Sequence, residues 1–149
     1  MAWTTDVLTD GHNTLLYAMA AGATATPGTA NEVPFASGYS WASEKDIQER
    51  GPWINLSTKK KTNAGTSNTG SLTIDMATAT NTVRALLIAA GTGTSRIQFT
   101  LFIGGANGDK RVWDQCLLNE AGEVTPDEGV ALTFDWEADS YAYTAGTYV

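Results

Sequence analysis

Alternation of apolar residues with a period of two is the feature that most limits how this chain can fold. It is clearest at 96–104, where Ile97, Phe99, Leu101 and Ile103 occupy every second position. Because successive side chains of a β-strand point to opposite faces of a sheet, such a segment buries one face. Two further segments share the pattern, 70–77 and 129–138. The chain is therefore predicted to be mainly β.

The remaining strands are placed by apolar runs that lie between turn-forming residues. They are expected at 13–20, 33–43 and 111–123, with a short extension at 53–57 and a last strand or arm over 140–149. Asn107 and Gly108 both tolerate positive φ, so they predict a hairpin turn before the strand 111–123.

A single helix is predicted where apolar residues recur at i, i+3, i+4 and i+7. These residues are Val83, Leu86, Leu87 and Ala90. Thr78 or Thr80 is expected to cap its start, and Gly91 to end it in a left-handed conformation. Together the elements indicate an antiparallel β-sandwich or barrel with one flanking α-helix. The 149 residues fit one domain, 1–149.

The sequence contains no signal for secretion or for a membrane. No basic N-terminal segment precedes an apolar run, and no apolar stretch approaches the ~20 residues that span a bilayer. The single cysteine, Cys116, excludes an internal disulfide framework. We therefore expect a soluble protein made in a cytoplasm, without membrane contact.

Segment 44–69 is predicted to be a long loop between the second and third strands. Loops of this length inside a compact domain are uncommon and usually functional. This loop carries the cations Lys45, Arg50, Lys59, Lys60 and Lys61. It also carries apolar residues that a solvated loop does not need, namely Ile47, Trp53, Ile54 and Leu56. We interpret the segment as an arm that a neighbouring copy orders.

Charge is distributed unevenly along the chain, whose net charge is −7. Five of the nine basic residues lie between 45 and 61, whereas eight acids and no base lie from Asp114 to the C-terminus. A protein that grips nucleic acid needs a basic face, which this pattern does not provide. Asp135 and Glu137 alternate with apolar residues in 129–138 and are expected on its solvent face.

The residues that carry chemistry are few. His12 is the only histidine and is predicted to lie in a polar turn, while Cys116 is predicted to be buried in a strand. Asp6, Asp10 and His12 match no calcium loop, and one cysteine with one histidine makes no zinc site. We expect no catalytic residue, no cofactor and no metal, and hence no enzyme.

The order of these patterns resembles the major tail tube protein of long, non-contractile-tailed, lambda-like bacteriophages. The resemblance covers nearly the whole chain. It rests on TLLYAMA as the opening strand, the long mixed-charge segment, GSLTIDM leading into ATATNTVRALLIAAGTG, and IQFTLFI with its hairpin. It implies a thin β-sandwich or barrel with one helix, like the tubes of type VI secretion and of contractile tails.

The resemblance also implies a function. It predicts a structural virion protein that forms hexameric rings, stacked by 44–69 into a hollow tail that houses the tape measure protein and conducts DNA without binding it specifically. Tail terminator and tail tip proteins are the further partners it implies. Asp135 and Glu137 are candidates for the lumen, and the chain ends too early for the C-terminal immunoglobulin-like domain of some relatives.

Two other classes of function remain open at this level. A capsid decoration or cement protein is also small, β-rich and acidic. A sugar-binding β-sandwich would use exposed tryptophans, which core or interface roles also explain. The chain has five: Trp3, Trp41, Trp53, Trp113 and Trp136.

Overall fold

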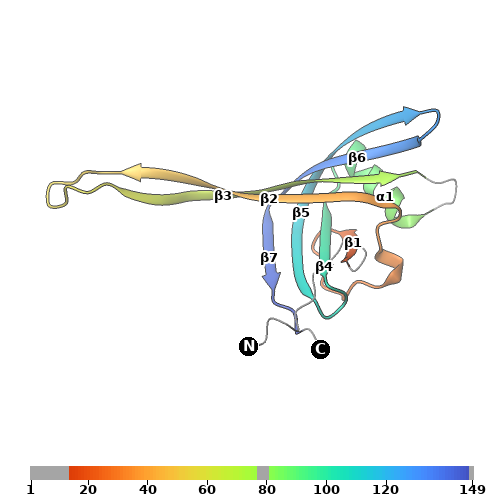
Figure 1. Cartoon of the computed structure of the whole chain (residues 1–149), viewed down its shortest axis with the longest axis horizontal. Coiled ribbons are helices and arrows are strands. Elements are labelled where there is room, and N and C mark those ends of the chain that lie inside the picture. The colour runs from red at the N-terminus through yellow and green to blue at the C-terminus, as the bar shows by residue number, and fades with distance from the viewer. Residues whose placement is uncertain (1–13, 77–80, 148–149) are drawn as a thin grey trace, which may run out of the picture.

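The computed structural model describes residues 14–76 and 81–147. Asp6, Asp10, His12 and the two threonines predicted to cap the helix lie outside these residues. In chain order the elements are β1 (Thr14–Ala20), the 3-10 helix η3 (Thr29–Asn31), β2 (Ala36–Arg50), β3 (Lys60–Asp75), α1 (Thr82–Thr92), β4 (Ile97–Ile103), β5 (Asp109–Thr125), β6 (Gly129–Ala138) and β7 (Ser140–Thr144). The fold is mainly β with one helix, as the sequence predicts (Figure 1).

All seven strands belong to one antiparallel sheet that bends at β5. Its path runs β1-β4-β5-β6-β3-β2, and β7 pairs with β5. Residues 109–116 of β5 pair with β4, whereas residues 117–125 pair with β6. Gln115 adopts a positive φ of 56° where the register to β4 shifts, and the Asp114 carboxylate accepts the Gln115 N–H at 2.8 Å. Such a bulge bends a strand and lets β5 pass from one layer to the other.

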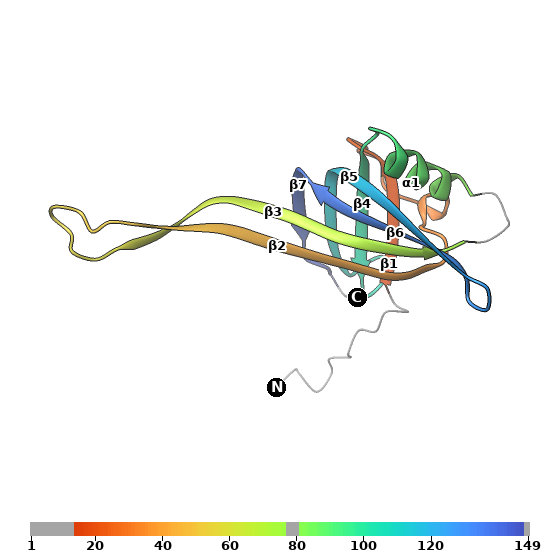
Figure 2. The same ribbon diagram turned by 90° about the horizontal axis from the view of Figure 1, so that it is seen from above.

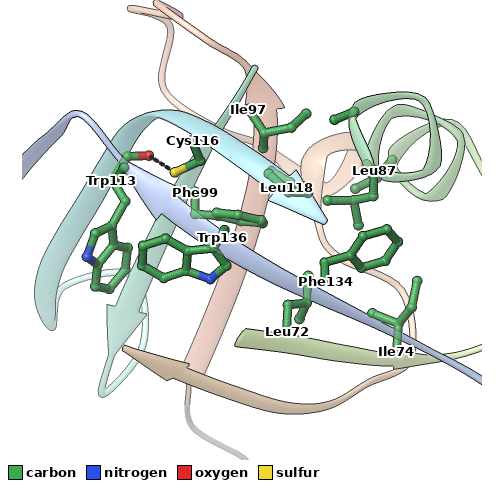
Figure 3. Packing of buried hydrophobic residues seen from close by; sticks show 14 of the residues in the cluster. Leu72, Ile74, Leu87, Ile97, Phe99, Trp113, Cys116, Leu118, Phe134 and Trp136 are labelled. Carbon is green, nitrogen blue, oxygen red and sulfur yellow. Dashed lines mark hydrogen bonds between the residues drawn. The ribbon is translucent and has the colours of Figure 1, made fainter. Parts of the chain in front are cut away.

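The hydrophobic core lies between the two layers and under α1 (Figure 3). The alternating residues fill it as predicted, since Leu72, Ile74, Ile97, Phe99 and Phe134 are fully buried. On β4 the intervening Gln98 and Thr100 are buried as well, which alternation alone does not predict. The Gln98 side-chain amide donates a hydrogen bond to the Ala23 carbonyl oxygen at 3.0 Å, so the segment after β1 covers this second face.

Helix α1 lies where the sequence places it, but both predicted ends differ. The cap is Asn81, whose side-chain oxygen accepts the N–H groups of Val83 and Arg84 at 2.9 and 3.0 Å. The helix continues through Gly91 to Thr92, and Gly93 follows it in an extended conformation. Gly91 instead serves close packing, because a Cβ there would lie 3.0 Å from the Phe134 ring.

The β4–β5 hairpin forms where it was predicted, and Asn107 and Gly108 lie in its turn at 104–108. The positive φ angles belong to Gly104 and Gly105, both at 89°, rather than to Asn107 and Gly108. Gly108 is required for another reason, since a Cβ there would overlap the Ile103 carbonyl oxygen.

The prediction of a long loop at 44–69 is wrong. β2 and β3 remain paired from Ala36 opposite Ile74 to Arg50 opposite Lys60, so the connection between them is only 51–59. The strand was missed because its side chains are polar and exposed on both faces, which leaves no apolar alternation to read. Backbone pairing and β-branched threonines hold it extended instead.

Candidate assembly surfaces

The far part of the β2–β3 hairpin is a two-stranded ribbon that projects from the body (Figures 1 and 2). β3 pairs with β6 only from Asn68 onward, so residues 60–67 have β2 as their only partner strand. We call residues 44–67 the ribbon and residues 50–61 its tip. The eight residues from Lys60 to Ser67 extend roughly 25 Å at the rise of a β-strand. A two-stranded ribbon is marginally stable in water by itself, so its length calls for a further contact.

Several apolar side chains at and near the tip are exposed to solvent. Ile54 is fully exposed, Ile47 is 62% exposed, and Trp53 and Leu56 are 46% and 39% exposed. Trp53 and Leu56 close the turn, because the Trp53 N–H donates to the Leu56 carbonyl at 2.8 Å and the reverse bond is 3.1 Å. The segment 53–57, predicted as a strand extension, is therefore the turn itself.

The predicted cations lie on the same ribbon. Arg50, Lys59, Lys60 and Lys61 belong to the tip, while Lys45 pairs with Thr66 nearer the body. All five are exposed. On the body, Arg96 forms an ion pair with Asp139 at 2.7 Å.

An acidic face lies opposite the core on the layer formed by β2, β3, β6 and the second half of β5. Asp135 and Glu137 are exposed there, as the alternation of β6 predicts, while Phe134 and Trp136 point into the core. In register, Asp135 faces Ser71 and Asn119, and Glu137 faces Thr69 and Leu117. The two carboxylates line an open depression of about 780 Å³.

A second exposed apolar group was missed by the sequence analysis. Met76 and Val130 belong to the apolar alternation of the predicted strands 70–77 and 129–138, which favours the core face, yet they are 37% and 38% exposed. Their faces are as predicted, but the strands run past the end of the core. Val124, which pairs with Val130, is 73% exposed, and Phe35 is 64% exposed. Apolar alternation shows which face of a strand is apolar but not how far along the strand the core extends. The exposure of these residues could therefore not be predicted from the sequence.

The four described tryptophans divide between the core and the surface, where Trp41 is 37% and Trp53 46% exposed. Trp113 and Trp136 are core residues, with 0% and 3% exposure. Trp53 lies at the tip, and the Arg111 guanidinium lies 5.4 Å from the Trp41 ring centroid. Trp3 falls outside the described residues.

Cys116 is a core residue, as predicted. It is fully buried, and its thiol donates to the Trp113 carbonyl oxygen at 3.5 Å (Figure 3). Burial raises the pKa of the Cys116 thiol to about 12, so it carries no reactive thiolate at neutral pH. Within 14–76 and 81–147 no group of three metal-binding side chains gathers, and no helix is long and apolar enough to cross a bilayer.

Comparisons with solved structures find proteins that share this fold. No protein-family model matches the sequence, and no curated protein matches it. The SPP1 tail tube has a TM-score of 0.68 at 9% identity, covering 93% of this chain and 80% of that chain. The tube-terminating cap of the anti-feeding prophage has a TM-score of 0.66 at 13% identity, covering 98% and 100%. The tail of an empty GTA particle, refined with C6 symmetry, has a TM-score of 0.63 at 10% identity, covering 93% and 100%.

The fold is that of a tail tube protein. Identities this low concern the fold and transfer no individual residue role. Within the tail tube fold, the surfaces available for assembly in this chain are therefore those defined above by exposure and charge.

Proposed function

We propose that this protein is the building unit of a bacteriophage tail tube. The observation that carries the proposal is the ribbon, which projects from a tail tube fold with an uncovered apolar tip. An isolated ribbon gains nothing from exposed Trp53, Ile54 and Leu56, whereas burial against another copy would stabilise both partners. The ribbon cations Lys45, Arg50, Lys59, Lys60 and Lys61 serve the same contact.

In this proposal six copies form a ring, and rings stack into a hollow tail of the long, non-contractile type. The C6 symmetry of the GTA tail supports the ring, and the resemblance described above supports the tail type. The tube houses the tape measure protein, meets tail terminator and tail tip proteins at its ends, and belongs to a virion assembled in the host cytoplasm. The role is structural rather than enzymatic.

The acidic face is proposed to line the lumen. Asp135 and Glu137 are exposed on the face of their layer that points away from the core. Like charge keeps DNA from adhering to the wall during ejection. Specific binding of DNA has no place in this arrangement.

Electron microscopy of the purified protein tests the proposal. Hollow tubes or six-fold rings are expected as the protein concentration rises. A protein that stays monomeric or trimeric at every concentration and coats capsids would be a cement protein and would overturn the proposal. A stable monomer that binds glycans would overturn it as well.

A further inference from the structure

We propose that the ribbon tip of one copy docks on the far end of the sheet in a second copy, in the adjoining ring. The far end is defined as Phe35 with residues 74–76 and 122–131. This inference rests on the proposed function and adds to it the surface that receives the ribbon. Figure 1 places the far end, where β3 ends and β5 turns into β6, opposite the tip.

The far end is an ordered surface rather than a frayed edge. The Met76 N–H donates to the Val130 carbonyl oxygen at 2.8 Å, and the Asp75 N–H donates to the Phe35 carbonyl oxygen at 3.0 Å. Val124 lies directly opposite Val130 in the β5–β6 ladder. Four chain segments therefore present Phe35, Met76, Val124 and Val130 together.

Phe35 is held exposed at a cost. Its φ is 51°, in the left-handed region that bulky residues avoid, and its side chain is 64% exposed. A residue kept in such a conformation is strained, and the surrounding structure must offset that strain. A chain that maintains a strained, exposed phenylalanine at this position gains from a contact there.

Exposed apolar residues concentrate at these two ends. Of the eleven large hydrophobic residues that are exposed in the described chain, eight lie at the far end or on the ribbon at or beside its tip. They are Phe35, Met76, Val124 and Val130 at the far end, and Ile47, Trp53, Ile54 and Leu56 on the ribbon. Paired clusters of this kind are what an interface between copies requires.

The charges of the two ends are opposite and equal in number. Residues 50–61 contain four bases and no acid, whereas residues 74–76 and 122–131 contain four acids and no base. The bases are Arg50, Lys59, Lys60 and Lys61, and the acids are Asp75, Glu123, Asp127 and Glu128. Asp75, Glu123 and Glu128 surround a hollow of about 120 Å³ at this end. Asp75 and Glu123 lie on the opposite face of their strands from Met76, Val124 and Val130, so the end of the sheet presents acids on one side and apolar residues on the other. The charge signs of the tip and the far end match across the proposed contact.

The positions of the tip and the far end indicate that a second copy of this chain binds at the far end. The tip and the far end lie at opposite ends of one layer, so they do not meet within a single chain (Figures 1 and 2). A contact between two different patches of identical chains is heterologous, and it propagates in one direction until a partner stops it. The inference therefore gives the tube a polarity, with every ribbon pointing the same way.

Cross-linking tests the contact directly. Thr58 is at the tip and Thr125 is at the far end, and replacing them removes neither charge nor apolar surface. The variant Thr58→Cys with Thr125→Cys is assembled and treated with a short bismaleimide, while buried Cys116 stays unreactive. We expect a ladder of linked chains that extends beyond six. The matched control pairs Thr58→Cys with Ala106→Cys in the β4–β5 turn and should give no ladder.

The outcomes separate this inference from the proposed function. Tubes without a ladder, or a ladder equal to that of the control, would leave the tube intact and refute the docking. A ladder that stops at six would place the contact within one ring and would also refute it. Failure of the unmodified protein to form rings or tubes would instead refute the proposed function.

Discussion

Arg50 and Lys60 lie directly opposite each other in the last register pair of the ribbon. Like charges at facing positions destabilise a β-ladder, and here Lys59 and Lys61 flank the pair. The tip is therefore electrostatically unfavourable in the free monomer. In the proposed contact an acidic surface would offset this repulsion, so we expect assembly to respond strongly to ionic strength.

Reversing the tip charges is expected to slow assembly. The variant Lys59→Glu, Lys60→Glu, Lys61→Glu should assemble several-fold more slowly by light scattering, and the defect should shrink as salt screens it. Adding Glu123→Lys, Asp127→Lys and Glu128→Lys to the same chain should restore the rate. A combined variant as slow as the triple variant would contradict a direct contact between the two ends.

Replacing Trp53 is expected to weaken tube assembly, whereas replacing Trp136 is expected to destabilise the folded monomer. Trp53→Ala removes a side chain that is 46% exposed, so the free energy of unfolding of the monomer should change by about 0.5 kcal/mol or less. Tube stability should fall by roughly 2 kcal/mol or more per contact. Trp136 is 3% exposed, and Trp136→Ala should cost about 3–5 kcal/mol of monomer stability. Urea unfolding and the critical concentration for assembly measure the two effects.

Cys116 is expected to be inert in the folded protein. Burial raises its pKa from 9.0 to about 12, so a thiol reagent at pH 8 should react only as fast as the chain unfolds. Since the unfolded thiol ionises first, this group's contribution to stability should be complete below pH 9 and should be lost as the pH rises towards 12. A Cys116→Ala variant should show less of this alkaline loss. Rapid labelling of the native protein would show that the thiol is accessible.

Much of the body of the fold could be predicted from the sequence because its strands alternate apolar and polar residues. β6 was placed at 129–138, its observed bounds, since Leu132, Phe134 and Trp136 alternate with polar residues. The ribbon could not be predicted in this way. From Glu44 to Arg50 and from Lys60 to Ser67 both faces are exposed, so the segment carries the composition of a loop while its backbone pairs as a strand.

The candidate assembly surfaces also could be predicted only in part. Trp53, Ile54 and Leu56 were found because apolar residues stand out in a polar segment. Val130 and Met76 were not found, because apolar residues in a strand ordinarily indicate core. Val124 was not found, because it lies just beyond the strand predicted at 111–123. Only the three-dimensional structure reveals that the core ends before these strands do.

The acidic face can be tested by inverting it. Asp135 and Glu137 are exposed, so Asp135→Lys with Glu137→Lys should leave monomer stability within about 1 kcal/mol of the original. Tubes of this variant should retain DNA at low salt, because the wall then attracts phosphate, and should release it as salt rises. Fluorescent DNA retained on pelleted tubes measures the effect. The face would lie outside the lumen if a density map of the tube places both residues on the outer wall.

Shortening the ribbon separates folding from assembly. Cutting 57–66 alone would leave residues 45–50 of β2 without their partner strand, so the cut should follow the register. Glu44 faces Ser67 and Lys45 faces Thr66, so replacing 45–66 by Asn-Gly leaves the Glu44–Ser67 pair closed by a two-residue turn. The core residues Leu72, Ile74 and Phe134 lie outside the cut, so the midpoint of thermal unfolding should stay within a few degrees of the original. Tubes should be lost, because both the apolar anchor and the tip cations are gone. A matched variant that keeps the length but changes Thr62 and Thr66 to serine should still assemble. Normal tubes from the shortened chain would mean that the ribbon does not join rings.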